Sequence, residues 1–375
     1  MTHVFTPRRL RWGAPAVVAA AIAAAAITST NAGASAQPKL PPRTAAQLLA
    51  AVEQAHPTGL SGTIVETANL GLPSLPDTPG GGGGGGLSPQ ALLSGSHTIR
   101  IWYAGPSQQR LAVLAPMSER DIIHNGSSLW TYTSTTNEVT HSTLPGSAEH
   151  KTSRSEAAVP TPQSAAEQAL RAIDPTTKVK VDRTARVAGR PAYQLDLVPR
   201  DTRSLIGSVR IAVDSATSVP LRVQVFARGA SSPAIQVGFT DVTFGTPNAS
   251  VFQFVPPAGA KVTQQSLGSH QGEGPTKAQG AHHGNFMKPR QHAHAAGASS
   301  SPTTLGKGWT TVVELPAGQL GSNAQLLNQM STPVAGGRLI TTALLSVLIT
   351  PDGHVFAGAV SGSALQHVAA TGHGL

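Results

Sequence analysis

Four histidines are the residues of this chain whose spacing first suggests chemistry. His282 and His283 are adjacent, and a single residue separates His292 from His294. Imidazoles placed this close together can bind Zn²⁺ or Cu²⁺. The surrounding tract is polar and carries no carboxylate fixed beside them, which favours weak, adventitious binding over a functional site. We therefore predict no metal centre and no cofactor.

Acidic and hydroxyl side chains are present, but their pattern does not favour an enzyme. Asp196, Asp214 and Asp241 alternate with apolar residues on predicted strands or lie at turns, so we expect them on a solvated face. No Gly-x-Ser-x-Gly nucleophile elbow occurs. The chain has no cysteine, which excludes disulfides, thiolate metal sites and a cysteine nucleophile. We predict a non-enzymatic protein without catalytic residues.

The amino terminus has the pattern of an export signal. Three arginines at positions 8, 9 and 11 precede an apolar run of residues 12–27, and Ala-Ser-Ala at 34–36 forms a cleavage motif. The alternative is an uncleaved membrane anchor. The run would be roughly 24 Å long as a helix, short of a hydrocarbon core of about 30 Å. We therefore predict a signal peptide over residues 1–36 and an exported, extracytoplasmic protein.

The charge of the chain does not point to nucleic acid. The net charge is +9, and three of these charges belong to the predicted leader. The remaining basic residues are scattered, and they do not interleave with aromatic residues as a nucleic-acid platform requires. We predict no nucleic-acid partner.

Two segments have helical periodicity. In residues 43–55, apolar side chains recur at the spacing of one helix face. In residues 162–173 the same spacing follows Thr161, a good N-cap, and Pro162, which suits the first helical position. Both helices are short, about 16 to 20 Å long.

Alternating apolar and polar residues predict strands through most of the remaining chain. The pattern occurs at residues 62–68, 98–103 and 110–114, and in nearly strict form in four later runs around 193–197, 209–213, 221–225 and 235–239. Asn125-Gly126 and Ala188-Gly189 mark hairpin turns. The residues between the apolar ones are mostly polar. This predicts an antiparallel sheet with one dry and one wet face.

Composition divides the chain into segments. We predict one domain over residues 37–262, interrupted by a glycine-rich loop at 73–95, and a disordered His/Gly-rich linker at 263–308. A carboxy-terminal β segment at 309–370 is predicted to contain three strands and a short helix near 324–329. Because about 60 residues make a marginal core by themselves, we expect this segment to pack on the main domain.

The helices and the sheet differ in size, and this predicts a fold. About ten strands spaced about 4.8 Å apart would make an open sheet near 48 Å wide, which two short helices cannot cover. We therefore predict a mainly β (α+β) fold, in which a curved antiparallel sheet forms an unclosed half-barrel with the helices as a lid. Such a shape encloses an apolar interior, the usual setting for an apolar ligand.

The apolar strand residues are the candidate ligand-binding residues. An ordinary packed core is the alternative for all of them, and sequence alone does not separate the two. Trp102 and Tyr103 must point to opposite faces of their strand, whereas Trp130 and Tyr132 share one. The candidate cavity-lining residues are Ile101, Tyr103, Leu111, Val113, Trp130, Tyr132, Tyr193, Leu195, Leu197, Ile211, Val223, Val225, Val237 and Phe239.

Several motifs resemble the LolA-like superfamily of periplasmic lipoprotein carriers, which includes the sensor proteins RseB and MucB. They are R-x-W-Y-x-G-P at 100–106, N-G-x-x-x-W-x-Y at 125–132, the TPQ-capped helix at 161, V-A-G-R-P-A-Y-x-L-x-L-x-P at 187–199 and I-x-V-D-x-x-T-x-x-P-L-R at 211–222. The resemblance covers about residues 41–262. It implies an unclosed antiparallel barrel with a helical lid and an interior that binds acyl chains.

Two functions follow from the resemblance. In the first, the protein is a carrier or binding protein that holds a lipid or a lipoprotein acyl chain. In the second, it is an RseB-like regulatory module that engages a membrane anti-sigma factor in envelope-stress signalling. The glycine tract and the carboxy-terminal extension lie outside the basic carrier pattern, and the Ala/Gly-rich composition suggests a high-GC, actinobacterial genome, in which transport to an outer membrane is a doubtful role.

Overall fold

The computed structural model describes residues 37–71, 94–144, 160–266, 302–318, 327 and 329–375. The predicted signal peptide, the four histidines of the linker and most of the glycine-rich loop lie outside these residues. All elements below belong to the compact unit Lys39–Leu375. Within the described residues, no helix is both long enough and apolar enough to cross a membrane.

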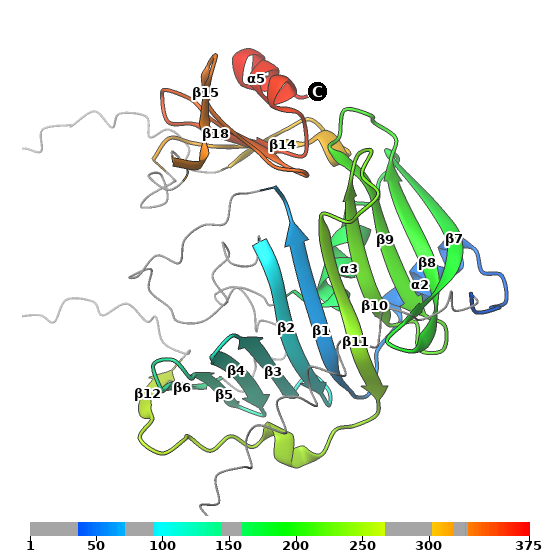
Figure 1. The fold of residues 1–375 in the computed structure, drawn as a ribbon, viewed down its shortest axis with the longest axis vertical. Helices are drawn as coiled ribbons and strands as arrows, with labels where there is room; N and C mark the ends of the chain where they lie inside the picture. The colour runs from blue at the N-terminus through cyan, green and yellow to red at the C-terminus, as the bar shows by residue number, and fades with distance from the viewer. Residues whose placement is uncertain (1–36, 72–93, 145–159, 267–301, 319–326, 328) are drawn as a thin grey trace, which may run out of the picture. The chain divides into compact units, whose positions relative to one another are not determined.

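The main feature of the fold is one 12-stranded sheet (Figure 1). Its strand order is β12-β6-β5-β4-β3-β2-β1-β11-β10-β9-β8-β7. The strands are β1 (Leu60–Asn69), β2 (Ser94–Tyr103), β3 (Gln108–Ala115), β4 (Ser118–Asn125), β5 (Ser128–Thr133), β6 (Glu138–Thr143), β7 (Thr177–Val187), β8 (Arg190–Pro199), β9 (Ile206–Asp214), β10 (Pro220–Ala227), β11 (Ile235–Phe244) and β12 (Lys261–Ser266).

The fold is mainly β, and the large sheet does not close into a barrel, as the sequence predicted. Its edge strands, β12 and β7, stand at opposite ends of the strand order. β7 also contacts β11, so the strands from β7 to β11 curl. One detail differs from the expected antiparallel sheet, because β12 pairs with β6 in parallel. This strand lies partly in the segment expected to be a disordered linker.

The two predicted helices form close to their expected positions and are fixed by their N-caps. They are α2 (Ala45–Glu53) and α3 (Pro162–Arg171). Thr44 forms a capping box with Gln47, and Thr161 forms one with Ser164. In each box the side chains satisfy backbone N–H groups that have no partner inside the helix.

The two predicted hairpin turns form. Gly126 follows β4 with a φ of 63°, and Ala188 and Gly189 join β7 to β8 with φ values of 49° and 74°. The positive φ of both Ala188 and Gly189 matches the right-handed twist of the flanking strands, whereas in the β4–β5 turn only Gly126 has a positive φ. Met117, at the tip of the β3–β4 hairpin, also has a positive φ of 58° and is fully exposed.

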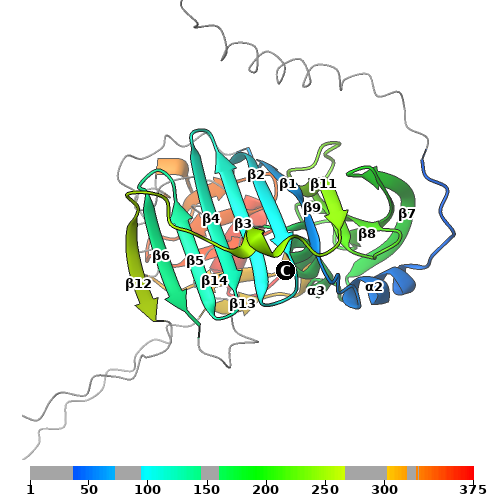
Figure 2. The same cartoon turned by 90° about the horizontal axis from the view of Figure 1, so that it is seen from below.

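A segment between β11 and β12, residues 245–260, crosses one face of the sheet and is called the strap below (Figure 2). It contains the 3₁₀ helix η3 (Ala249–Phe252), which contacts β3 and β4. Phe252 is 1% exposed. The Arg110 guanidinium donates a hydrogen bond to the Val251 carbonyl (3.3 Å) and so fastens the strap to β3.

The carboxy-terminal segment forms a second, 6-stranded sheet rather than the three strands expected. Its order is β13-β14-β18-β17-β16-β15, and α5 packs against β16, β17 and β18. The elements are β13 (Thr303–Leu305), η4 (Gly308–Thr310), β14 (Val312–Leu315), β15 (Thr332–Val334), β16 (Gly337–Thr341), β17 (Ser346–Ile349), β18 (Val355–Gly358) and α5 (Gly362–Thr371). Leu348, Val360, Leu365 and Val368 form its core. The helix expected near 324–329 falls mostly outside the described residues.

Hydrogen bonds and apolar contacts join the second sheet to the first. The Trp309 indole donates to the Thr177 hydroxyl (2.7 Å), and the Leu205 amide donates to the Ala359 carbonyl (2.8 Å). Leu344 is 8% exposed and packs beside Leu70. That residues 309–370 do not fold by themselves stays a prediction.

Candidate functional site

The two helices of the main domain cover one part of the large sheet. Val52 of α2 and Ala166 of α3 pack with Leu195, Ile211 and Val223 in one buried cluster. We call the face that carries these strand residues the helix face, and the opposite one the strap face. Under the helices, the helix face is a packed core.

Cross-strand register continues the helix face across the sheet. Facing residues of paired strands point to the same side, and one row runs from Leu195 through Ile211, Val223 and Val237 to Glu66. Twelve of the fourteen predicted cavity residues belong to this face. They are Ile101, Tyr103, Leu111, Val113, Tyr193, Leu195, Leu197, Ile211, Val223, Val225, Val237 and Phe239.

Trp130 and Tyr132 lie on the strap face instead. Trp130 stands opposite Ile123, and Ile123 stands opposite Arg110. Arg110 precedes Leu111 by one residue on β3, so this row points to the face opposite that of Leu111 and its partner Ile101. Their rings lie 5.5 and 6.0 Å from the ring of Phe254 in the strap. These two aromatic residues therefore do not share a surface with the other candidates.

On β2 and β3, the helix face carries apolar residues that no helix in the described part of the chain joins. Ile99 and Val113 are buried there, and Ile101 and Leu111 are half-buried. The described members of the cluster that contains them are strand residues and a turn residue, and none of these comes from a helix. Ile122 of β4 stands opposite Leu111 and extends the same surface. We call these five residues the open stripe.

Two of the three aspartates expected on a solvated face are buried. Asp196 is 2% exposed and lies 3.7 Å from the Lys180 ammonium and 3.8 Å from the Arg210 guanidinium. Burial raises the pKa of Asp196, an effect that the nearby Arg210 charge opposes. Asp241 is exposed, as expected.

Asp214 is held by a denser set of donors. It is 1% exposed, and Arg190 donates to its two oxygens at 2.6 and 3.0 Å. Burial acts to raise the pKa of Asp214, but the hydrogen bonds from Arg190 and Thr217 hold it below its ordinary value. The expectation of a wet face was therefore wrong here, because the curl of β7–β11 buries side chains on both faces. These aspartates have structural partners.

Glu66 and His97 are the polar pair that sequence reasoning missed. They face each other on β1 and β2, on the helix face, and Glu66 is 5% exposed. Their nearest side-chain atoms, Glu66 Oε2 and His97 Nδ1, are 3.6 Å apart. Burial raises the pKa of Glu66 to about 7 and lowers the pKa of His97. The signal in the sequence was a carboxylate in the apolar register of a strand, at the position that follows Ile64 by two.

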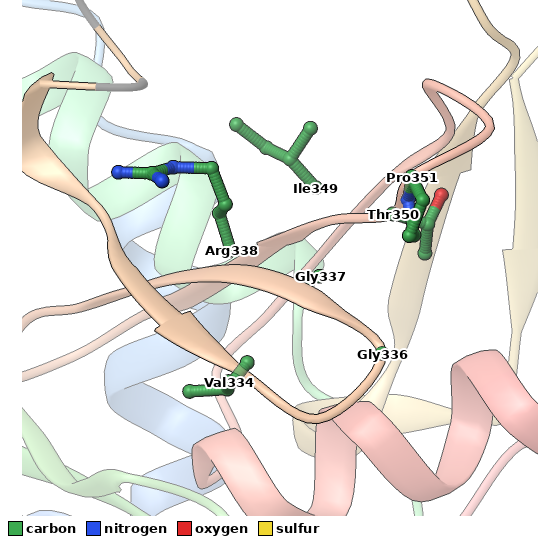
Figure 3. Close-up of a pocket in the computed structure, with 7 residues that line it drawn as sticks. All are labelled: Val334, Gly336, Gly337, Arg338, Ile349, Thr350 and Pro351. Atoms are coloured by element: carbon green, nitrogen blue, oxygen red, sulfur yellow. The ribbon is translucent and has the colours of Figure 1, made fainter.

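The described residues also line two pockets away from the open stripe. One, of about 540 Å³, lies at the β15–β16 turn (Figure 3) and includes Arg338, whose guanidinium donates to the Ser331 hydroxyl (2.8 Å) and carbonyl (3.0 Å). The other, of about 640 Å³, lies between the end of α2 and the β9–β10 turn. Neither pocket is lined by a predicted site residue.

The described part of the chain contains no candidate metal site. No group of three His, Asp or Glu side chains there could hold a metal ion. The four histidines of the linker, His282, His283, His292 and His294, lie outside the described residues. That they form no functional metal site therefore stays a prediction.

Comparison with known proteins gives a match to one family model and a list of similar solved structures. Residues 94–266 match the model of the MucB/RseB N-terminal domain, which corresponds to the large sheet from β2 to β12. Among solved structures, the MucA/MucB complex of Pseudomonas aeruginosa is 16% identical, with a TM-score of 0.41, over 87% of this chain and 96% of that chain. A LolA superfamily protein from Nitrosomonas europaea is 11% identical, with a TM-score of 0.23, over 57% of this chain and 99% of that chain.

The family match confirms the resemblance to RseB/MucB that the motifs indicated, in the region where most of those motifs lie. No curated protein matches the chain. The match supports a binding or regulatory module built on an unclosed half-barrel.

Proposed function

We propose that this protein is an exported, non-enzymatic binding protein that holds a lipid or lipoprotein acyl chain on the open stripe. One observation carries the proposal. Among the described residues, no helix packs in the cluster that contains most of the open stripe, and Ile101, Leu111 and Ile122 in the stripe remain half-buried. Apolar side chains gain free energy when water is removed from them, at about 25 cal/mol per Å². An acyl chain along the stripe would complete their burial.

The test uses two leucines of one strand that point to opposite faces. Leu111 lies in the open stripe and Leu114 on the strap face, and both are half-buried. Leu111→Asp should weaken binding of a fluorescent fatty-acid probe by about tenfold or more, because the chain would have to desolvate a carboxylate. Leu114→Asp should leave probe binding within about twofold of wild type.

Thermal melts of both variants serve as the control for folding. Equal loss of binding in the two variants, or a wild-type protein that does not bind the probe at micromolar concentration, would contradict the acyl-chain proposal.

The match to the MucB/RseB N-terminal domain favours a second function, in which the same domain engages the extracytoplasmic part of a membrane anti-sigma factor. A neighbouring sigma/anti-sigma gene pair would supply the partner to test. Binding of that partner segment, measured by calorimetry with and without a saturating fatty acid, separates the two functions. Tight binding of the segment by a protein that does not bind the fatty acid would establish the regulator.

A further inference from the structure

Glu66 and His97 interrupt the helix face at the place where its helix-covered part meets the open stripe. The row through Glu66 contains Ile211, Val223 and Val237 on one side and His97 on the other. Along β1, Ile64 is fully buried and Ala68 is 4% exposed. Nothing in the alternation of β1 requires a carboxylate there, since an apolar residue would complete the row. A buried polar residue at such a position suggests a binding role.

The pair does not satisfy itself. The 3.6 Å between Glu66 Oε2 and His97 Nδ1 is longer than a hydrogen bond. Both atoms are inaccessible to water, and neither has a hydrogen-bond partner among the described residues. Buried polar atoms are nearly always paired in folded proteins. Two adjacent, unpaired atoms therefore point to a group that comes from outside.

Within the described strands that pair with β1, no second charged side chain faces this pair. On the strands paired with β1, the residues that face Glu66 are His97 and the apolar Val237. Arg120 also belongs to the helix face, but it lies on β4, three strands from β1. Burial is the single cause of the raised Glu66 pKa, so a cation brought to the site would stabilise the ionised carboxylate.

The chemistry of the two atoms selects the ligand. A carboxylate oxygen accepts hydrogen bonds, and so does Nδ1 of a neutral histidine whose proton is on Nε2. An ammonium group has three N–H donors and can reach both atoms, whereas a hydroxyl has one. A carboxylate or phosphate head group would instead be repelled by Glu66. An ammonium also supplies the charge that a buried carboxylate requires.

We propose that Glu66 and His97 bind the primary ammonium group of an amphiphile whose apolar chain lies along the open stripe. Ile99 is two positions from His97 on the same face of β2, so the chain would begin next to the head group. The proposal rests on the proposed acyl-chain function and specifies its head group. Because both atoms are inaccessible to water, the side chains around the pair must move apart when the amphiphile binds, so that its ammonium group can reach them.

The test compares decylamine, decanol and decanoate by calorimetry on the full chain near pH 8. Wild type should bind decylamine about tenfold more tightly than decanol, the size of one charge-assisted contact, and decanoate less tightly than decanol. Glu66→Gln should abolish the preference for the amine, because it weakens decylamine binding far more than decanol binding. Glu119→Gln is the matched control, because Glu119 lies on the strap face of β4.

The preference for the amine should also increase as the pH rises from about 6 to 8, since Glu66 ionises over this range. His97→Phe gives a second variant that keeps the carboxylate and should reduce the preference for the amine severalfold.

If decanol binds and decylamine binds no more tightly, the head-group proposal is wrong and the acyl-chain function stands. If decanol does not bind but decylamine binds in a Glu66-dependent way, the acyl-chain function fails and the amine site stands.

Discussion

The two halves of the large sheet have the same alternating sequence pattern but bury it in different ways. On β8, β9 and β10, the apolar residues pack under α2 and α3. On β2 and β3, the described members of the corresponding cluster come from strands and a turn, and the strap covers the opposite face of β3 and β4. The comparison shows that period-two alternation specifies a strand and its two faces, whereas the covering element decides whether a face becomes core or a binding surface.

The strap explains how the half of the sheet without helices is stabilised. Ile123 of β4 and Val139 of β6 are fully or almost fully buried on the strap face, and so is Phe252 of the strap. The Arg110–Asp121 ion pair, at 2.8 Å, lies on the same face. Because the strap buries this face, the open stripe on the other face can remain partly exposed without loss of the fold.

The largest effect is expected from a charge in the helix-covered half. Val223→Asp places a carboxylate among Val52, Ala166 and Ile211, where Val223 is 3% exposed. We expect the variant to lose about 4 kcal/mol or more and its cooperative thermal transition, because a charge without a partner is buried. Gln224→Asp, the next residue on the opposite face, should cost about 1.5 kcal/mol or less. A Val223→Asp protein that melts like wild type would mean that this half is an open cavity.

The second prediction concerns the strap. Phe252→Ala should reduce the free energy of unfolding by about 3 kcal/mol, the usual cost of removing a buried phenyl ring. Phe254→Ala, which removes a half-buried ring near Trp130, should cost less and should change the tryptophan fluorescence more. Chemical denaturation measures both. If Phe252→Ala costs no more than a substitution at an exposed position, the strap is not the cover of the β2–β6 half.

The third prediction is a pH dependence that originates at the boundary of the two halves. Glu66 has a folded-state pKa of about 7 against an ordinary value of 4.5. Between these values the folded state binds more protons than the unfolded state, so its stability decreases as the pH rises. We expect a loss of about 2 to 3 kcal/mol from pH 4.5 to pH 8 that comes from Glu66.

Glu66→Gln should remove this loss and be more stable than wild type near pH 8. His97, whose pKa is lowered by burial, contributes in the opposite direction, with stability that is lost as the pH falls. The quantity to measure is therefore the difference between wild type and Glu66→Gln at each pH. A difference that is constant from about pH 5 to 8 would mean that Glu66 is not desolvated.

Sequence reasoning identified the strands and helices because each has a strong local signal. The capped helix at Thr161 and the hairpin at Asn125-Gly126 formed as predicted. Short elements were missed, since β13 and β15 have three residues each and show no period. Strand β12 was missed because its residues are polar and exposed, and backbone pairing with β6 holds it in place.

The faces were harder to predict than the strands. Alternation places Trp130 and Tyr132 together, but only the register through β4 shows that they oppose Leu111. The burial of Asp196 and Asp214 depends on Arg210 and Arg190 from neighbouring strands, and on the curl that brings β7 to β11. Such facts are set by pairs of residues far apart in the sequence, which one sequence does not reveal.

The smallest expected effect tests whether the second sheet supports the helix-covered half. Trp309 packs on the cluster under α2 and α3, and its indole N–H donates to the hydroxyl of Thr177, which is 6% exposed. Trp309→Phe should cost about 1 kcal/mol through the lost hydrogen bond, together with some lost contact area. Thr177→Val should cost a similar amount. Because the two side chains share one hydrogen bond, the double variant should cost less than the sum of the single variants by about 1 kcal/mol.

The measurement is a double-mutant cycle by chemical denaturation. Trp102→Phe on β2, in the other half, is the control that should show no coupling to Thr177→Val. If the costs of Trp309→Phe and Thr177→Val simply add, the contact contributes nothing in solution, and this bond does not couple the second sheet to the helix-covered half.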